Sequence, residues 1–186
     1  MQKTGTKSIV LIGLFSALTA AGAFIRLPMW PVSITLQFFI TICAGLMLGA
    51  RKAAASQLIY LLVGLAGVPV FSEGGGIGYI AKPSFGFLVG LIPAAYVVGI
   101  VGRKRRDIAG MICAGAAGLA VLYLAGLPYM YFSVNVIMKA RMPVWAAISS
   151  GMLVFLPGDI LKIVAAAIVS LQTLKRAGNI FGSSLD

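Results

Sequence analysis

Phe155-Leu156-Pro157-Gly158-Asp159-Ile160-Leu161-Lys162 carries two opposite charges into an otherwise apolar segment. The chain then reads ILKIVAAAIVSLQTL from Ile160 to Leu174, and Lys175-Arg176 end this apolar run. In a helix that rises ~1.5 Å per residue, Asp159 and Lys162 lie roughly 22 and 18 Å from the Leu174 end. A hydrocarbon core is ~30 Å thick, so both charged groups would lie inside it.

The spacing of Asp159 and Lys162 predicts that they share one face of the helix, because residues i and i+3 are neighbours. An ionised group facing lipid costs at least ~2.5–3.5 kcal/mol, so such residues normally face the protein interior and mark a function. Two interpretations remain open. The pair could be an internal ion pair that only holds helices in register, or part of a ligand site, which we favour.

The composition predicts an all-α integral membrane protein of one domain. Of the 186 residues, 60% are hydrophobic and only 10% are charged, and the mean hydropathy is +1.03. So few charges could not cover the surface of a soluble protein. The net charge of +11 does not indicate nucleic-acid binding, because the basic residues form short clusters between apolar runs rather than a stripe on a soluble domain.

Six apolar runs predict a bundle of six transmembrane helices in a single domain, residues 1–186. The approximate spans are 8–25, 34–50, 53–70, 84–101, 108–127 and 148–174. We expect a break at Pro157, since discontinuous helices build ligand sites in transporters. The segment 128–145 carries Asn135, Lys139 and Arg141 among apolar residues and could form a short interfacial amphipathic helix.

The Lys and Arg residues on alternate loops predict the orientation. Four lie on one side, in Arg26, Lys82, Lys139 and Arg141. Ten lie on the other side, in Lys3, Lys7, Arg51, Lys52, Arg103, Lys104, Arg105, Arg106, Lys175 and Arg176. The positive-inside rule makes the ten-charge side cytoplasmic, so both termini would be inside and Asp159 and Lys162 would lie in the outer half of the membrane.

The residue inventory argues against several kinds of chemistry. The chain has no histidine, the commonest general base and zinc ligand, so no metal or cofactor is expected. Cys43 and Cys113 both lie in apolar runs and are expected to be small buried hydrophobic residues. The glycines of residues 74–78 lack the Gly-Lys-Ser/Thr ending of a phosphate-binding loop and predict a flexible external lid instead.

The outer face collects the polar side chains that could bind a small amphipathic ligand. Lys162 and Lys82 could meet a carboxylate, and Asp159 could accept hydrogen bonds from paired N–H groups. Aromatic side chains could cover the apolar body of the ligand. The candidate ligand-binding residues are Asp159, Lys162, Lys82, Glu73, Gln37, Tyr60, Tyr79 and Trp30.

A line of small side chains follows the first predicted helix, where Gly13, Ala17 and Ala21 recur every four residues. Such faces allow a second helix to approach closely. Internal packing and a surface for a partner protein both remain open from the pattern alone.

Three segments resemble the BioY family, the biotin-specific S components of energy-coupling factor (ECF) transporters. They are PVSITLQ at 31–37, GLAGVPVFSEGGGIGYIAKPSFGF at 64–87 and FLPGDILK at 155–162. The resemblance implies a six-helix S-component bundle in a prokaryotic cell membrane, with biotin bound near the outer surface. The implied partners are a transmembrane T subunit and two cytoplasmic ATPases, which would supply the energy.

The resemblance also implies roles for particular residues. The Gly-Asp-x-x-Lys motif of the family contributes ligand contacts, which assigns them to Asp159 and Lys162. The Ala-x-x-x-Ala pattern that docks S components on the T subunit matches Ala17 and Ala21. The chain departs mildly from the family pattern at Ser33, Ser84 and Phe87.

The expected function is therefore high-affinity capture of biotin for uptake. The alternative is an S component or a stand-alone carrier for another small vitamin. A membrane enzyme is not expected, because no histidine or cysteine–base pair supports acid–base or nucleophilic chemistry.

Overall fold

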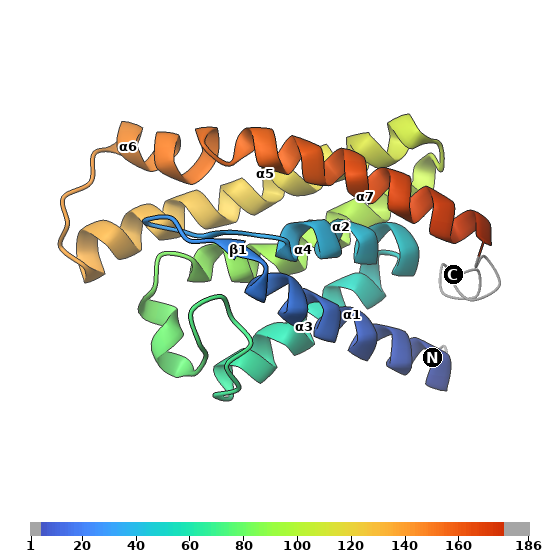
Figure 1. Cartoon of the computed structure of the whole chain (residues 1–186), viewed down its shortest axis with the longest axis horizontal. Coiled ribbons are helices and arrows are strands. Elements are labelled where there is room, and N and C mark those ends of the chain that lie inside the picture. The colour runs from blue at the N-terminus through green and yellow to red at the C-terminus, as the bar shows by residue number, and fades with distance from the viewer. Residues whose placement is uncertain (1–4, 177–186) are drawn as a thin grey trace.

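Helices make up most of residues 5–176, which are the residues described by the computed structural model (Figure 1). The α-helices are α1 (Thr6–Phe24), α2 (Gln37–Leu48), α3 (Ala50–Leu65), α4 (Phe85–Lys104), α5 (Ile108–Phe132), α6 (Val144–Ile148) and α7 (Leu156–Arg176). Shorter turns are the 3₁₀ helix η1 (Ile77–Ala81) and the π-helical turns η2 (Ser133–Ile137) and η3 (Ser149–Leu153). With α6, η3 and α7 as one interrupted helix, this is the predicted six-helix, all-α membrane fold.

Four helical stretches are long and apolar enough to cross a membrane: Thr6–Phe24, Phe85–Lys104, Ile108–Ile137 and Val144–Arg176. The other two helices are shorter than the spans predicted from the sequence. The 12 residues of α2 rise only ~18 Å, less than the thickness of a hydrocarbon core. Gly49, with φ of 77°, turns the chain directly from α2 into α3.

The start of the second predicted span forms a strand instead of a helix. β1 (Arg26–Leu27) pairs antiparallel with β2 (Ile34–Thr35), with Arg26 opposite Thr35. The backbone N–H of Leu36 then donates to the carbonyls of Gly22 and Ile25, which ties the hairpin to the end of α1. Two-residue strands are too short to show an alternating pattern, so the sequence did not predict them.

The segment 128–145, which could have formed an interfacial helix, does not form a separate helix. Residues 128–132 are the end of α5 and residues 133–137 form η2. The chain then reverses before α6 begins at Val144. Lys139 and Arg141 take positive φ angles of 53° and 50° in this reversal. The Asn135 side-chain amide closes it by donating to the carbonyls of Tyr131 and Met142, both at 3.1 Å.

The predicted break near Pro157 is confirmed. η3 ends at Leu153 and α7 begins at Leu156, so Pro157 lies in the first turn of α7, where a missing N–H costs no helical hydrogen bond. The break places Asp159 in the first turn of α7.

The helices pack so that α4 and α5 form the most extensive pair, while α1 lies against α2 and α3. Buried polar side chains join these last three helices. The Gln57 amide donates to Thr19 Oγ1 at 3.1 Å, and Thr41 Oγ1 donates to Gln57 Oε1 at 3.3 Å. The expected burial of both cysteines is correct for Cys43 and wrong for Cys113, which is exposed on α5.

The start of α1 and the end of α7 lie at one end of the bundle (Figure 1). The β-hairpin, η1 and the α5–α6 connection lie at the opposite end. This arrangement fits an even number of membrane crossings, and the cytoplasmic position of the termini stays a prediction.

Candidate functional site

A cavity of about 70 Å³ lies near the β-hairpin end of the bundle. Most of its surface is apolar, with hydroxyl, amide and charged groups placed among the apolar side chains. Its lining consists of Val32, Ser33, Ile34, Thr35, Gln37, Phe38, Ser72, Tyr79, Ser84, Phe87, Leu88, Leu91, Leu122, Tyr123, Gly151, Phe155, Asp159 and Lys162. An apolar pocket with a few convergent polar groups is the usual form of a small-molecule site.

Asp159, Lys162 and Tyr123 form a hydrogen-bonded cluster in the cavity wall. Lys162 Nζ lies 2.8 Å from Asp159 Oδ1, and the Tyr123 hydroxyl donates to Asp159 Oδ2 at 2.6 Å. The side chains of Asp159 and Lys162 are only 6% and 11% exposed. The predicted i, i+3 pair is therefore formed, and Tyr123 from α5 completes it.

The surroundings explain how this cluster can be buried. Charges removed from water need partners, and each oxygen of Asp159 has one. Asp159 also lies in the first turn of α7, where the positive end of the helix dipole favours a carboxylate. Within residues 5–176, no group of three His, Cys, Asp or Glu side chains could hold a metal ion.

Gln37 at the start of α2 lines the cavity and is fixed from two sides. Its amide donates to the Tyr60 hydroxyl at 2.7 Å, and its Oε1 accepts from the Thr35 hydroxyl at 2.9 Å. Tyr60 in turn donates to the carbonyl of Val70 at 3.1 Å. Tyr60 is a predicted ligand-binding residue, but it does not line the cavity. It holds Gln37, which does.

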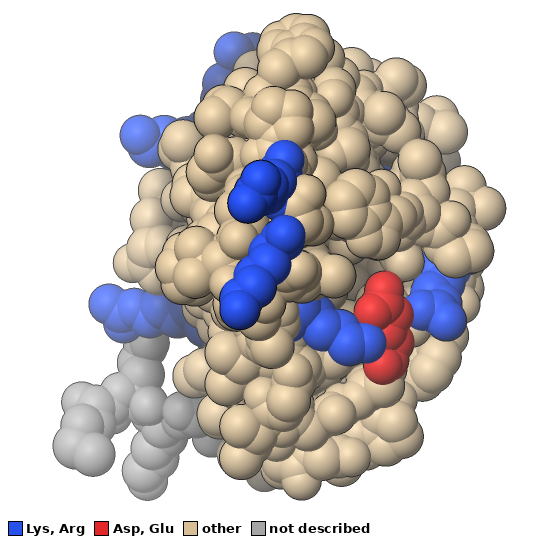
Figure 2. Space-filling view, turned by 90° about the vertical axis from the view of Figure 1, so that its left-hand side faces the viewer, with Lys and Arg blue, Asp and Glu red and all other residues tan. Residues whose placement is uncertain are grey.

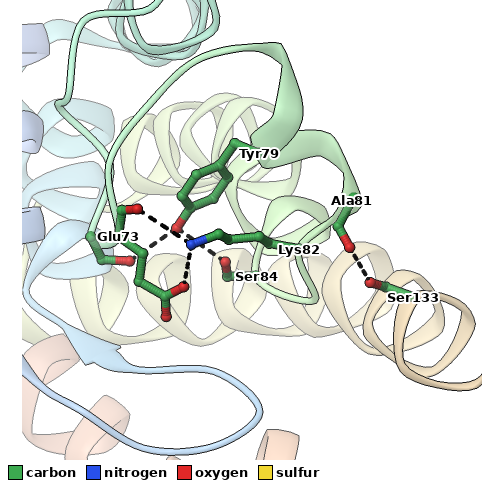
Figure 3. Close-up of polar contacts among 7 residues, drawn as sticks. Glu73, Tyr79, Ala81, Lys82, Ser84 and Ser133 are labelled. Carbon is green, nitrogen blue, oxygen red and sulfur yellow. Dashed lines mark hydrogen bonds and ion pairs between the residues drawn. The ribbon is translucent and has the colours of Figure 1, made fainter. Parts of the chain in front are cut away.

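Tyr79 on η1 contributes its hydroxyl to the cavity, together with two serines. The Tyr79 hydroxyl lies 3.1 Å from Ser72 Oγ and accepts a hydrogen bond from Ser84 Oγ, also at 3.1 Å (Figure 3). The end of η1 is fastened to the α5 side of the bundle. Ser133 Oγ donates to the carbonyl of Ala81 at 2.6 Å, and the Tyr129 hydroxyl donates to that of Ile80.

The glycines before η1 form a hydrogen-bonded turn. Gly74 and Gly76 have φ angles of 115° and 93°, which favour glycine. The Gly76 N–H donates to the carbonyl of Gly64 at 2.7 Å, and Gly74 pairs with Phe71. The backbone of the predicted external lid is therefore tied to α3.

Lys82 and Glu73 do not line the cavity but form an ion pair at its margin. Lys82 Nζ lies 2.8 Å from Glu73 Oε2 and 3.3 Å from the Glu73 carbonyl oxygen. The Lys82 ammonium also lies 5.1 Å from the centre of the Tyr79 ring. Trp30, with 61% of its surface exposed, is outside the lining as well, so the structure does not place it over the cavity.

The structure thus brings together four of the eight predicted ligand-binding residues: Asp159, Lys162, Gln37 and Tyr79. The cavity lining also includes residues that no sequence pattern indicated, namely Tyr123, Thr35, Ser33, Ser72 and Ser84. One signal could have identified Tyr123. It lies 17 residues beyond Arg106, or ~26 Å along a helix, which is close to the depth of Asp159.

The small residues of α1 lie away from the cavity. Gly13, Ala17 and Ala21 are all exposed, and a Cβ atom added to Gly13 would meet nothing within 4 Å. Internal packing does not account for this face within residues 5–176.

Comparison with known proteins identifies relatives along nearly the whole chain. Residues 1–179 match the BioY family. A probable biotin transporter BioY of Lysinibacillus sphaericus is 39% identical, over 99% of this chain and 93% of the relative. The biotin transporter BioY of Thermotoga maritima is 34% identical, over 91% and 96% of the two chains.

A solved structure shares the fold. The crystal structure of the S-component for biotin from an ECF-type ABC transporter superposes with a TM-score of 0.80 and 22% identity, covering 94% of both chains. On the family match and the two relatives, the chain belongs to the BioY family.

Proposed function

We propose that this protein is the substrate-binding S component of a biotin uptake system, which captures biotin in the cavity beside Asp159. The observation that carries the proposal is the buried cluster of Asp159, Lys162 and Tyr123 in a chain whose relatives are named biotin transporters. The cluster has no net charge, and it combines a strong acceptor with a strong donor.

The cluster suits the ureido group of biotin, which offers two N–H donors and one carbonyl acceptor. A carboxylate has about four acceptor positions, and Lys162 and Tyr123 use two of those on Asp159. The remaining positions can accept the ureido N–H groups. Lys162 has three N–H donors, so it can serve the ureido carbonyl while it stays paired with Asp159.

The valerate carboxylate of biotin is better served elsewhere. Lys162 is in contact with Asp159, so an acid bound to Lys162 would meet a like charge. The hydroxyls of Ser72, Tyr79 and Ser84 offer neutral donors, and Lys82 lies just beyond the Tyr79 ring. We therefore place the carboxylate near these hydroxyls, which changes the sequence-based expectation that Lys162 meets it.

The same proposal covers the partners and the location. The protein would reside in the prokaryotic cell membrane as a multi-pass protein with cytoplasmic termini, as its distribution of Lys and Arg indicates. A T subunit would dock on the exposed small residues of α1, and two ATPases would supply the energy. The exposure of Gly13, Ala17 and Ala21 supports this docking surface.

Isothermal titration of the detergent-purified protein with biotin tests the proposal. We expect tight binding at near one-to-one stoichiometry. Competition with riboflavin and thiamin distinguishes a component for another vitamin. Absence of heat or displacement at micromolar biotin would contradict the biotin assignment.

A further inference from the structure

We infer that Glu73 is an internal competitor of the ligand carboxylate. Glu73 forms an ion pair with Lys82 in the free protein, and the carboxylate of a bound ligand replaces Glu73 as the partner of Lys82. This inference rests on the proposed function. It gives Glu73 a role opposite to the direct ligand contact expected from the sequence.

The first observation is that Glu73 lies at the end of the molecule where the anionic ligand is proposed to bind. Among residues 5–176 the carboxylate side chains are Glu73, Asp107 and Asp159. Asp159 belongs to the buried cluster, and Asp107 pairs with Arg105 in the connection between α4 and α5. Figure 2 shows this end of the molecule, with basic side chains on both sides of a small acidic patch.

The second observation is that the Lys82–Glu73 pair is accessible and easily exchanged. Their side chains are 39% and 35% exposed, in contrast to the buried pair on α7. Exposed ion pairs of this kind contribute little stability, because water and salt compete for both charges. A second carboxylate can therefore displace Glu73 without a large penalty.

The third observation is the position of the Lys82 ammonium relative to the cavity. It lies 5.1 Å from the centre of the Tyr79 ring, and the hydroxyl of that ring lies in the cavity wall between Ser72 and Ser84. In Figure 3 the Lys82 ammonium lies beside the Tyr79 ring and points toward Glu73, and Ser84 lies beside the stem of the lysine. The four-carbon stem of lysine is flexible, so a change of rotamer can redirect the ammonium to the hydroxyl cluster.

These three observations predict a charge-selective effect on affinity. A ligand that carries a carboxylate must separate Lys82 from Glu73 before it can form its own ion pair with Lys82. Its carboxylate must also approach the negative charge of Glu73. A neutral ligand of the same shape leaves the Lys82–Glu73 pair intact. Glu73 therefore lowers the affinity for the acid and leaves the affinity for the neutral analogue unchanged.

The test compares biotin with biotinamide, its neutral carboxamide, by isothermal titration of the full-length protein. Glu73→Gln should tighten biotin binding about two- to fivefold, the range set by an exposed ion pair. Biotinamide affinity should not change. Glu73→Ala removes the same carboxylate and should act likewise, while Glu73→Asp keeps the charge and should stay close to the parent protein. In the double variant Glu73→Gln with Lys82→Gln, the increase in biotin affinity expected for Glu73→Gln alone should be lost.

The outcomes separate this inference from the proposed function. If the parent protein binds no biotin, both are overturned. If the parent binds biotin but Glu73→Gln and Glu73→Ala bind it equally or more weakly, Glu73 is not a competitor and only this inference fails. An equal gain for biotin and biotinamide would also overturn it, because it would indicate a general change in the loop.

Discussion

Asp159 has one hydrogen-bond partner on each carboxylate oxygen. Lys162 comes from the same helix three residues later, and Tyr123 comes from α5. The spacing in the sequence predicted the first partner. No local pattern specified the second, because the neighbour of α7 at this height depends on how the helices pack.

Removing either charge of the buried pair should weaken biotin binding strongly. We expect Asp159→Asn and Lys162→Ala each to lower the affinity more than tenfold, or over ~1.4 kcal/mol, because each leaves the other charge without its partner. Isothermal titration of the purified variants measures this. Asp107→Asn removes an exposed carboxylate from the α4–α5 connection and is the control. Near-normal affinity in both Asp159 and Lys162 variants would contradict the assignment.

Tyr123→Phe isolates the hydrogen bond to Asp159. The ring, which packs edge-on against Phe87, is kept, and only the hydroxyl is lost. Hydrogen bonds to charged groups contribute ~1.5–3 kcal/mol, so we expect biotin affinity to fall about tenfold or more. Tyr96→Phe, at an exposed position on α4, should leave the affinity unchanged. Equal titration curves for the two variants would show that the Tyr123 hydroxyl does not contribute.

At the scale of elements, the aromatic side chain of Phe71 packs between the end of α3 and the glycine-rich turn, beside the hydrogen bond from Gly76 to Gly64. Phe71 is 1% exposed and packs against the rings of Tyr60 and Tyr79, with centroid distances of 5.5 and 4.6 Å. It lies directly on the backbone of Gly64, where an added Cβ would come 2.1 Å from the Phe71 ring. Gly64 is thus required for the close approach that places Tyr79 in the cavity wall.

Gly64→Ala should therefore displace Phe71 and destabilise this part of the fold by roughly 1–3 kcal/mol, the usual effect of overpacking. Thermal unfolding in detergent would show a lower midpoint, and biotin binding should weaken with it. Gly13→Ala is the matched control, since a Cβ at that position meets nothing within 4 Å. A midpoint for Gly64→Ala that equals that of Gly13→Ala would contradict this account.

At the scale of the whole molecule, ligand site and proposed docking surface lie on different parts of the bundle. The cavity is walled by α2, α4, α5, α7 and the loops beside them, whereas α1 packs against α2 and α3 and leaves its small residues exposed. This separation predicts that assembly and binding can be impaired independently.

Ala17→Leu should reduce recovery of the complex with the T subunit and ATPases, because a bulky side chain prevents close helix approach. Biotin affinity of the isolated variant should stay unchanged. Co-purification from cells expressing all the subunits measures the first effect, and titration measures the second. Ala116→Leu introduces the same bulk on the exposed face of α5 and should assemble normally. Normal recovery of the complex with Ala17→Leu would contradict the docking surface.

Hydropathy and residue spacing were sufficient to predict the membrane class, the order of six helices, a break near Pro157 and the shared helix face of Asp159 and Lys162. Each of these follows from hydropathy or from spacing along one helix, which are local properties of the chain. The short lengths of α2 and α3, the β-hairpin and the set of side chains that line the cavity depend on how the helices pack against one another. The tertiary structure joins Tyr123 to Asp159, places Tyr60 behind Gln37 and pairs Lys82 with Glu73. These contacts join residues from different elements, and only the packing of those elements fixes which of them meet.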